Sequence, residues 1–140
     1  MRSRIPYSLF YYPPTRAFPA GRKSSRPLVR LTLANGPHRL SCSAILDSGA
    51  DFCAFPLSLA RPLGLDPSAV VPDSTYGLGT YSAPTYFHNV QIDLPGTAAF
   101  DVYAGFTEAL DQWGFGLLGQ TGFLERFKIT FDLLNGVFEI

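Results

Sequence analysis

The sequence has few cysteines, few histidines and no long apolar run. Two cysteines and two histidines occur among its 140 residues, too few for a disulfide framework or for a zinc site made of Cys and His. No apolar stretch approaches the roughly 20 residues that a membrane-spanning helix requires. Charged residues make up 16% of the chain, against about a quarter in an average protein, and 46% are hydrophobic, which argues against global disorder.

The cysteines and the first residues both bear on the compartment. We expect Cys42 and Cys53 to be unpaired apolar side chains, as is typical of a reducing compartment. The apolar stretch near the N-terminus is interrupted by Pro6 and ended by Pro13 and Pro14, so it does not resemble a signal peptide. The expectation is a cytoplasmic protein with no membrane partner, no metal and no cofactor.

Turn-forming residues are abundant instead. The chain holds 13 glycines and 12 prolines without a repeating period, which favours a turn-rich β protein over a helical one. Its length suits one domain with a core of its own. We predict strands over residues 28–33, 40–46, 52–55, 86–94, 98–104, 128–131 and 137–140, and one short helix in each of 57–63 and 121–127. The predicted fold class is all-β, a closed β-barrel.

Charge is distributed unevenly along the chain. The first 40 residues contain eight of the eleven Lys and Arg and no acid, whereas residues 41–140 contain three bases and all eleven acids. We therefore divide the chain into a basic, Pro- and aromatic-rich arm at 1–27 and a domain at 28–140. Such an arm can bind nucleic acid or lie on an acidic protein body, its own or a partner's. The bases are dispersed, so nucleic acid is not the expected partner.

The most informative local sequence is Ala44-Ile45-Leu46-Asp47-Ser48-Gly49-Ala50-Asp51. An ionisable residue directly after an apolar strand, at a turn that uses Gly, is a costly placement. Asp-Ser-Gly alone is common in ordinary turns, but the apolar run before it and Ala-Asp after it make the pattern much more specific.

With this motif the chain resembles the retropepsins, the retroviral-type single-domain aspartic proteases, and their bacterial relatives. The likeness covers most of residues 26–140. After Arg26-Pro27-Leu28-Val29 come the Asn35-Gly36 hairpin, the Asp47 motif, the flap-like Gly77-Leu78-Gly79, and Leu117-Leu118-Gly119-Gln120 before a C-terminal helix, all in the family's order.

The resemblance implies hydrolysis of peptide bonds by two aspartates and a water. Two carboxylates about 3 Å apart share one proton, so one acts as base and the other as acid. The chain has no second Asp-Ser/Thr-Gly, and the second carboxylate must come from Asp47 of another copy in a homodimer. The implied substrate is a polypeptide.

The resemblance also implies roles for the residues of this motif. Asp47 matches the catalytic aspartate, and Ser48 matches the hydroxyl residue that holds the two active-site loops together. Gly49 permits the tight turn and lets the backbone approach substrate. Ala50 and Asp51 match positions that bind the peptide backbone.

Two further segments complete the implied site. Gly77, Leu78 and Gly79 match a mobile flap that closes over substrate. Leu118 and Gly119 match residues that support the active-site loop from beneath.

The chain departs from the retroviral pattern at Gln120, at Thr80 and Tyr81 of the flap, where more glycine is usual, and at its N-terminus. Gln120 stands where that pattern has an Arg paired with the acid aligned to Asp51, and an amide makes a weaker bond to a carboxylate. The first 25 or so residues are additional, so residues 5–12 or 137–140 are both candidates for a terminal dimer sheet.

Two other functions remain as alternatives. A catalytically silent protease-like fold that serves dimerisation or peptide binding would have no need of the complete Asp47 motif. Nucleic-acid binding by the basic arm would weaken steeply with salt. A dinucleotide fingerprint, G-x-G-x-x-G, occurs at 114–119, but too few residues follow it for a doubly wound sheet.

Overall fold

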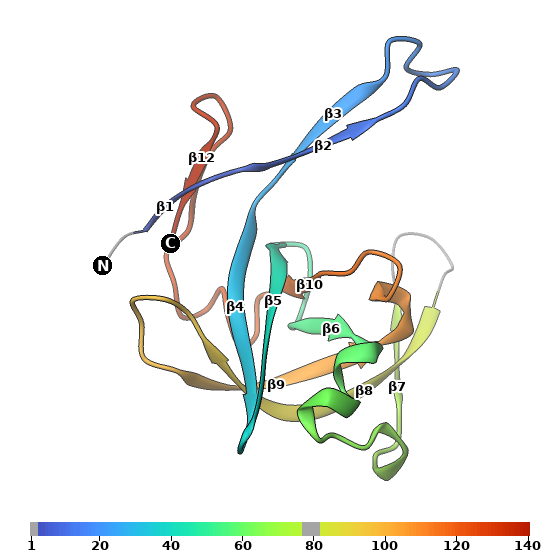
Figure 1. Cartoon of the computed structure of the whole chain (residues 1–140), viewed down its shortest axis with the longest axis vertical. Helices are drawn as coiled ribbons and strands as arrows, with labels where there is room; N and C mark the ends of the chain where they lie inside the picture. Colours follow the sequence, from blue (N-terminus) through green and yellow to red (C-terminus); the bar gives the residue numbers. More distant parts are fainter. Residues whose placement is uncertain (1–2, 77–81) are drawn as a thin grey trace.

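The structure is a computed structural model that describes residues 3–76 and 82–140. In that part of the chain, strands predominate and the helices are short 3₁₀ turns (Figure 1). The strands are β1 (Arg4–Pro6), β2 (Ser8–Tyr12), β3 (Arg22–Arg26), β4 (Leu28–Asn35), β5 (His38–Leu46), β6 (Ala54–Pro56), β7 (Asp73–Tyr76), β8 (Ser82–Asp93), β9 (Phe100–Thr107), β10 (Gly116–Leu118), β11 (Thr130–Asp132) and β12 (Val137–Glu139). The 3₁₀-helices are η1 (Leu57–Leu59), η2 (Arg61–Leu63), η3 (Pro67–Ala69) and η4 (Glu108–Leu110).

The main sheet has the strand order β4-β5-β10-β6-β9-β8-β7. β4 also pairs with β8, so six of these strands form a continuous hydrogen-bonded circuit, and β7 is attached to β8 outside it. The predicted all-β class is confirmed. The predicted hairpin joins β4 to β5, with Asn35 as the last residue of β4 and Gly36-Pro37 as the turn; Gly36 has a φ of 57° that favours glycine.

The core follows from side-chain alternation along these strands. In β4, Val29, Leu31 and Leu33 are buried while Arg30 is exposed, as expected when successive side chains point to opposite faces. The same inner face receives fully buried side chains from distant strands, among them Phe55, Ile92, Phe106 and Leu118. The apolar residues that flank the Asp47 motif are thus part of one core.

The ends of the chain form a second sheet, with the order β1-β12-β11. Ile5 and Phe131 pair with Phe138 from its two sides. Phe138 is fully buried and its ring lies 5.4 Å from that of Tyr7. Of the two candidates for a terminal sheet, the start of the first segment (β1) pairs with the second (β12) within one chain, whereas residues 8–12 pair with β3 instead.

β2 and β3 form a separate two-stranded hairpin that projects from the body (Figure 1). Its pairing runs from Ser8 opposite Arg26 to Tyr12 opposite Arg22. We refer to residues 8–26 as the hairpin arm. The sequence indicated a basic arm over residues 1–27 but did not reveal this internal pairing.

The two predicted helices differ in the structure. Residues 57–63 form two 3₁₀-helices, η1 and η2, because Pro62 has no N–H to continue an α-helix. Residues 121–127 form a bridge and a series of turns, and the predicted helix is wrong. Gly122 has a φ of 98°, outside the helical region, and its N–H donates to Glu125 Oε1.

Strand boundaries also shift from the predicted ones. The strand predicted at 52–55 is β6, Ala54–Pro56, and that predicted at 98–104 is β9, Phe100–Thr107. The short strand β10, Gly116–Leu118, was not predicted. No helix in the described part of the chain is long and apolar enough to cross a membrane.

Candidate active site

The Asp47 loop leaves the sheet where three strands meet. β10 lies between β5 and β6, parallel to β5 and antiparallel to β6. The register places Leu118 beside Leu46, and the backbone N–H of Asp47 donates to Leu118 O at 3.1 Å. A strand from late in the sequence thus fixes the point at which β5 ends and the acid emerges.

A tight turn then orients the Asp47 side chain. Its Oδ1 accepts a 2.9 Å hydrogen bond from the Gly49 N–H, and its carbonyl accepts from the Ala50 N–H at 3.1 Å. Asp47 is half-buried, while Ser48 and Gly49 are exposed. The carboxylate is therefore held by a backbone donor and still faces solvent, as a group that acts on a substrate requires.

Residues 119–121 hold the far side of the loop. The Gln120 N–H donates to Ala50 O and the Thr121 N–H to Asp51 O, each at 2.9 Å. Gly119 lies so close to the backbone of residues 50–52 that a Cβ there would be 2.3 Å from Phe52 O and 2.7 Å from Ala50 O. Only glycine permits this approach, so the position of the loop depends on Gly119.

The Gln120 side chain makes a different bond from the expected one. Its Nε2 donates to Ser48 O at 2.8 Å, rather than to the Asp51 carboxylate. The amide therefore links the residues that follow β10 directly to the Asp47 loop. Asp51 remains exposed and lies at the rim of the neighbouring pocket.

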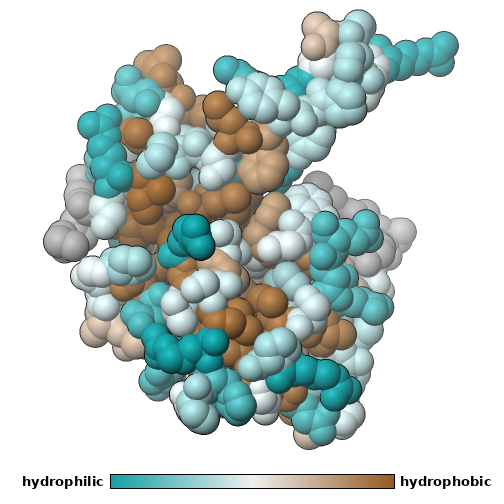
Figure 2. All heavy atoms as spheres, viewed as in Figure 1, coloured by the Kyte–Doolittle hydropathy of each residue, from teal (hydrophilic) through white to brown (hydrophobic). Residues whose placement is uncertain are grey.

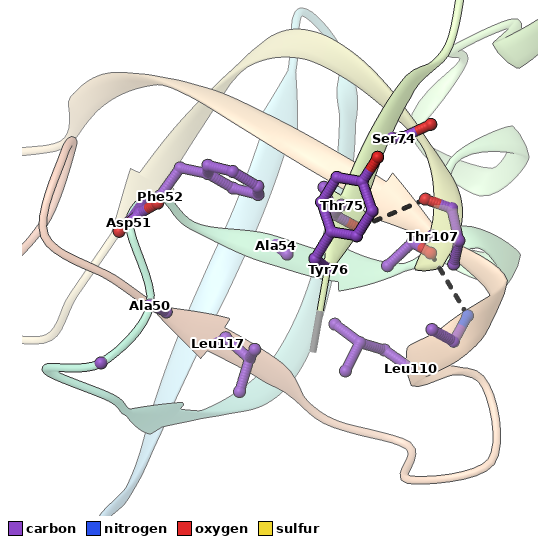
Figure 3. A pocket seen from close by; sticks show the side chains of 13 residues that line it. Ala50, Asp51, Phe52, Ala54, Ser74, Thr75, Tyr76, Thr107, Leu110 and Leu117 are labelled. Atoms are coloured by element: carbon purple, nitrogen blue, oxygen red, sulfur yellow. Dashed lines mark hydrogen bonds between the residues drawn. The ribbon is translucent and has the colours of Figure 1, made fainter. Parts of the chain in front are cut away.

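A pocket of about 360 Å³ opens beside the loop (Figure 3). Its walls come from the loop, β6, β7, β8, the end of β9, η4 and β10. The lining residues are Gly49, Ala50, Asp51, Phe52, Ala54, Ser74, Thr75, Tyr76, Ala83, Thr107, Ala109, Leu110 and Leu117. Leu110, Leu117 and Ala54 give it an apolar interior, and Asp51 and Ser74 place polar groups at its wall.

β7 and β8 form the hairpin predicted to carry a flap. Tyr76 pairs with Ser82, and Thr75 Oγ1 lies 2.7 Å from the Oγ1 of the fully buried Thr85. This hydroxyl pair links β7 to a buried residue of β8. The predicted flap residues Gly77, Leu78 and Gly79 lie outside the described residues.

The structure brings the predicted loop and its supports together. Asp47, Ser48, Gly49, Ala50 and Asp51 form one turn and its continuation, with the backbone of residues 118–121 bonded to it. Sequence reasoning missed the pocket walls from η4 and β7, because no local pattern indicates that these segments meet. Among the described residues no group of three or more His, Cys, Asp or Glu is placed to hold a metal.

Comparisons with known proteins bear on the fold. No family model matches the chain, and no curated protein matches it. The structure is similar to the crystal structure of a retropepsin-like aspartic protease from Rickettsia conorii, with a TM-score of 0.61 and 17% sequence identity. The similarity covers 95% of this chain and 98% of that one. The fold of this chain is therefore that of a retropepsin-like aspartic protease.

Proposed function

We propose that the protein is an aspartic endopeptidase, active as a homodimer. The observation that carries the proposal is the Asp47 turn: a half-exposed carboxylate directly after the buried Leu46 at the end of β5, with Oδ1 held by the Gly49 N–H at 2.9 Å. The loop stands beside an apolar pocket. The similarity of fold to a retropepsin-like aspartic protease supports the same function.

The chemistry requires two copies of the chain. One Asp-Ser-Gly motif occurs in the sequence, so the partner's Asp47 supplies the second carboxylate. One carboxylate takes a proton from water as the water oxygen bonds to the peptide carbon, and the other, protonated, donates to the carbonyl oxygen. Collapse of this intermediate breaks the C–N bond, and a proton passes to the leaving amine.

The remaining site residues have proposed roles in binding. Ala50 and Asp51, at the wall of the pocket, bind the backbone of the peptide, and Gly77, Leu78 and Gly79 close over it. The interior formed by Leu110, Leu117 and Ala54 accepts an apolar side chain of the substrate.

A peptide mixture digested between about pH 4 and 7 tests the proposal. Cleavage sites are identified by mass spectrometry for the unaltered protein, for Asp47→Asn, and for the matched control Asp101→Asn, an exposed acid on β9. Asp47→Asn keeps the shape of the side chain but removes its proton chemistry. We expect cleavage by the unaltered protein and the control, and none by Asp47→Asn.

Two results contradict the proposal. Equal cleavage by all three proteins would indicate a contaminating protease. No cleavage by any of them, in samples shown to be folded and dimeric, would favour a catalytically silent protease-like fold that binds peptides or serves dimerisation.

A further inference from the structure

The hairpin arm has no assigned role in the proposed protease. We propose that it clasps the second copy of the chain, laying its exposed face on the acidic body of that copy. This inference rests on the proposed homodimer and adds to it an interaction surface outside the active-site loops.

The root of the arm lies beside the catalytic loop. β4 pairs with β5 with Leu28 opposite Ile45, and the Leu46 N–H donates to Pro27 O at 3.0 Å. The hairpin arm thus joins the body at Arg26, the last residue of β3, close to the end of β5 from which Asp47 follows. From there the hairpin extends beyond the end of β5 (Figure 1). Because the partner's Asp47 must approach this same end, the arm extends toward the side that the partner occupies.

The direction of the arm is fixed at its root. The Arg26 guanidinium donates to Tyr12 Oη at 2.7 Å and lies 5.3–5.8 Å from the ring centroids of Phe10, Trp113 and Phe115. Trp113 and Phe115 belong to the segment that enters β10, the strand beneath the catalytic loop. Cation–π contacts to this segment orient the hairpin before any partner binds.

The far end of the arm is also ordered. The Arg22 guanidinium stacks on Tyr12, 4.0 Å from its centroid, and faces Phe18 at 5.7 Å. The N–H groups of Thr15 and Gly21 both donate to Phe18 O. Gly21 has a φ of 77°, and a Cβ there would lie 2.7 Å from Tyr12 O, so a glycine is required.

One face of the ribbon has no cover from the described chain. Along β2, Phe10 and Tyr12 turn toward Arg26, and Leu9 and Tyr11 point the other way. Leu9 is 51% and Tyr11 75% exposed, and Lys23 stands opposite Tyr11 on β3. A two-stranded ribbon gains little stability on its own, and an apolar face on a projecting ribbon is typical of a surface that meets a partner.

Apolar residues are also exposed on a second element, on the side of the molecule from which the arm projects. Leu133 and Leu134, in the turn between β11 and β12, are 63% and 95% exposed. In Figure 1 this turn and the arm both project above the body, with the end of β5 between them. Figure 2 shows apolar side chains gathered below the root of the arm, in the region that these two hairpins flank.

Charge indicates which kind of surface the arm meets. Residues 8–26 contain four bases and no acid, whereas residues 41–140 contain eleven acids and three bases. The salt bridge seen among the described residues, between Arg39 and Asp93, lies outside the arm. The partner's body is acidic and therefore complements it. The bases are dispersed along the arm rather than run together, which disfavours nucleic acid.

Sedimentation equilibrium in an Asp47→Asn background, which prevents self-digestion, tests the arm. The double variant Leu9→Ser/Tyr11→Thr removes the apolar face and keeps β-compatible side chains. The control Val71→Thr changes an apolar residue that is 92% exposed and lies on the loop between η3 and β7, outside the arm. We expect the double variant to raise the dimer Kd at least about tenfold and the control to leave it unchanged, with unaltered circular dichroism in both.

A charge reversal provides a second, independent test. Lys23→Glu should raise the dimer Kd, and the Kd of the unaltered dimer should rise with salt because screening weakens the attraction. The control Arg61→Glu makes the same change of charge on η2, away from the arm, and should leave the Kd unchanged.

The outcomes separate this inference from the proposed function. A dimer whose Kd is unaffected by Leu9→Ser/Tyr11→Thr and Lys23→Glu overturns the clasp and leaves the protease proposal standing. A chain that is monomeric at every concentration overturns both. Binding of a labelled oligonucleotide that Lys23→Glu abolishes, with an unchanged dimer Kd, assigns the arm to nucleic acid instead.

Discussion

Replacing Gly119 by Ala tests whether β10 positions the catalytic loop. The added Cβ would lie 2.3 Å from Phe52 O, 2.7 Å from Ala50 O and 2.7 Å from the Phe52 carbonyl carbon. These are backbone atoms, which cannot rotate aside as a side chain does, so the loop must retreat by about 1 Å to restore ordinary van der Waals contact. That retreat stretches the bonds from Gln120 N–H to Ala50 O and from Thr121 N–H to Asp51 O.

The expected loss follows from this displacement. Overpacking of this kind costs about 2–3 kcal/mol, which lowers the Tm by about 6–12 °C in a domain of this size. A misplacement of about 1 Å in a catalytic group lowers the rate by about 100-fold. Gly36→Ala is the matched control, because it has a φ of 57° and nothing within 4 Å of its Cβ. It incurs a backbone cost of about 1–2 kcal/mol at the opposite end of β5, without touching the loop.

The assay combines thermal unfolding at one fixed protein concentration with cleavage of a peptide found in the digest. Gly119→Ala should lose both stability and cleavage, whereas Gly36→Ala should lose only stability. A Gly119→Ala protein with the Tm and the activity of the unaltered one would refute the reasoning that close approach of Gly119 fixes the loop.

Two further predictions concern titratable side chains. Burial lowers the pKa of His88, and the nearby Asp66 offsets this shift only partly. The unfolded chain therefore takes up a proton at this histidine at a higher pH than the folded chain does. As a result, the free energy of unfolding falls as the pH drops below about 6.5. His88→Phe should flatten the dependence of the urea midpoint on pH between about 7 and 5, and an unchanged slope would contradict this. Burial also raises the pKa of Cys42 to about 12 and raises that of Cys53. Both thiols should therefore resist a disulfide reagent at pH 8 until urea unfolds the chain, and rapid labelling of the folded protein would disprove their protection.

The parts of the site that were predictable are the local ones. The turn after Leu46 could be recognised because an acid and a glycine follow a buried strand, and the support by Leu118 and Gly119 followed from the resemblance. The β4–β5 hairpin was equally readable, since Asn-Gly is a hairpin signal, although the two turn residues are Gly36 and Pro37 and the positive φ lies at Gly36.

The parts that were not predictable depend on pairing between distant segments. The pairing of β2 with β3 is one example, because a long loop with no two-residue turn signal separates Tyr12 from Arg22. The helix predicted at 121–127 failed because Gly122 adopts a positive φ to let its N–H reach Glu125. Only the folded chain shows that Leu110 and Thr75 face one pocket, since nothing in either segment indicates the other.

The insertion of β10 between β5 and β6 sets an order of assembly. β5 ends at Leu46 and β6 begins at Ala54, whereas β10, which lies between them, begins only at Gly116. During synthesis the catalytic loop emerges while the strand that must fix it is still unmade, and contacts of such long sequence separation form slowly. A nascent chain therefore carries Asp47 without a formed site. The activity proposed for this site would therefore wait until about 70 further residues have left the ribosome and the sheet has closed around β10.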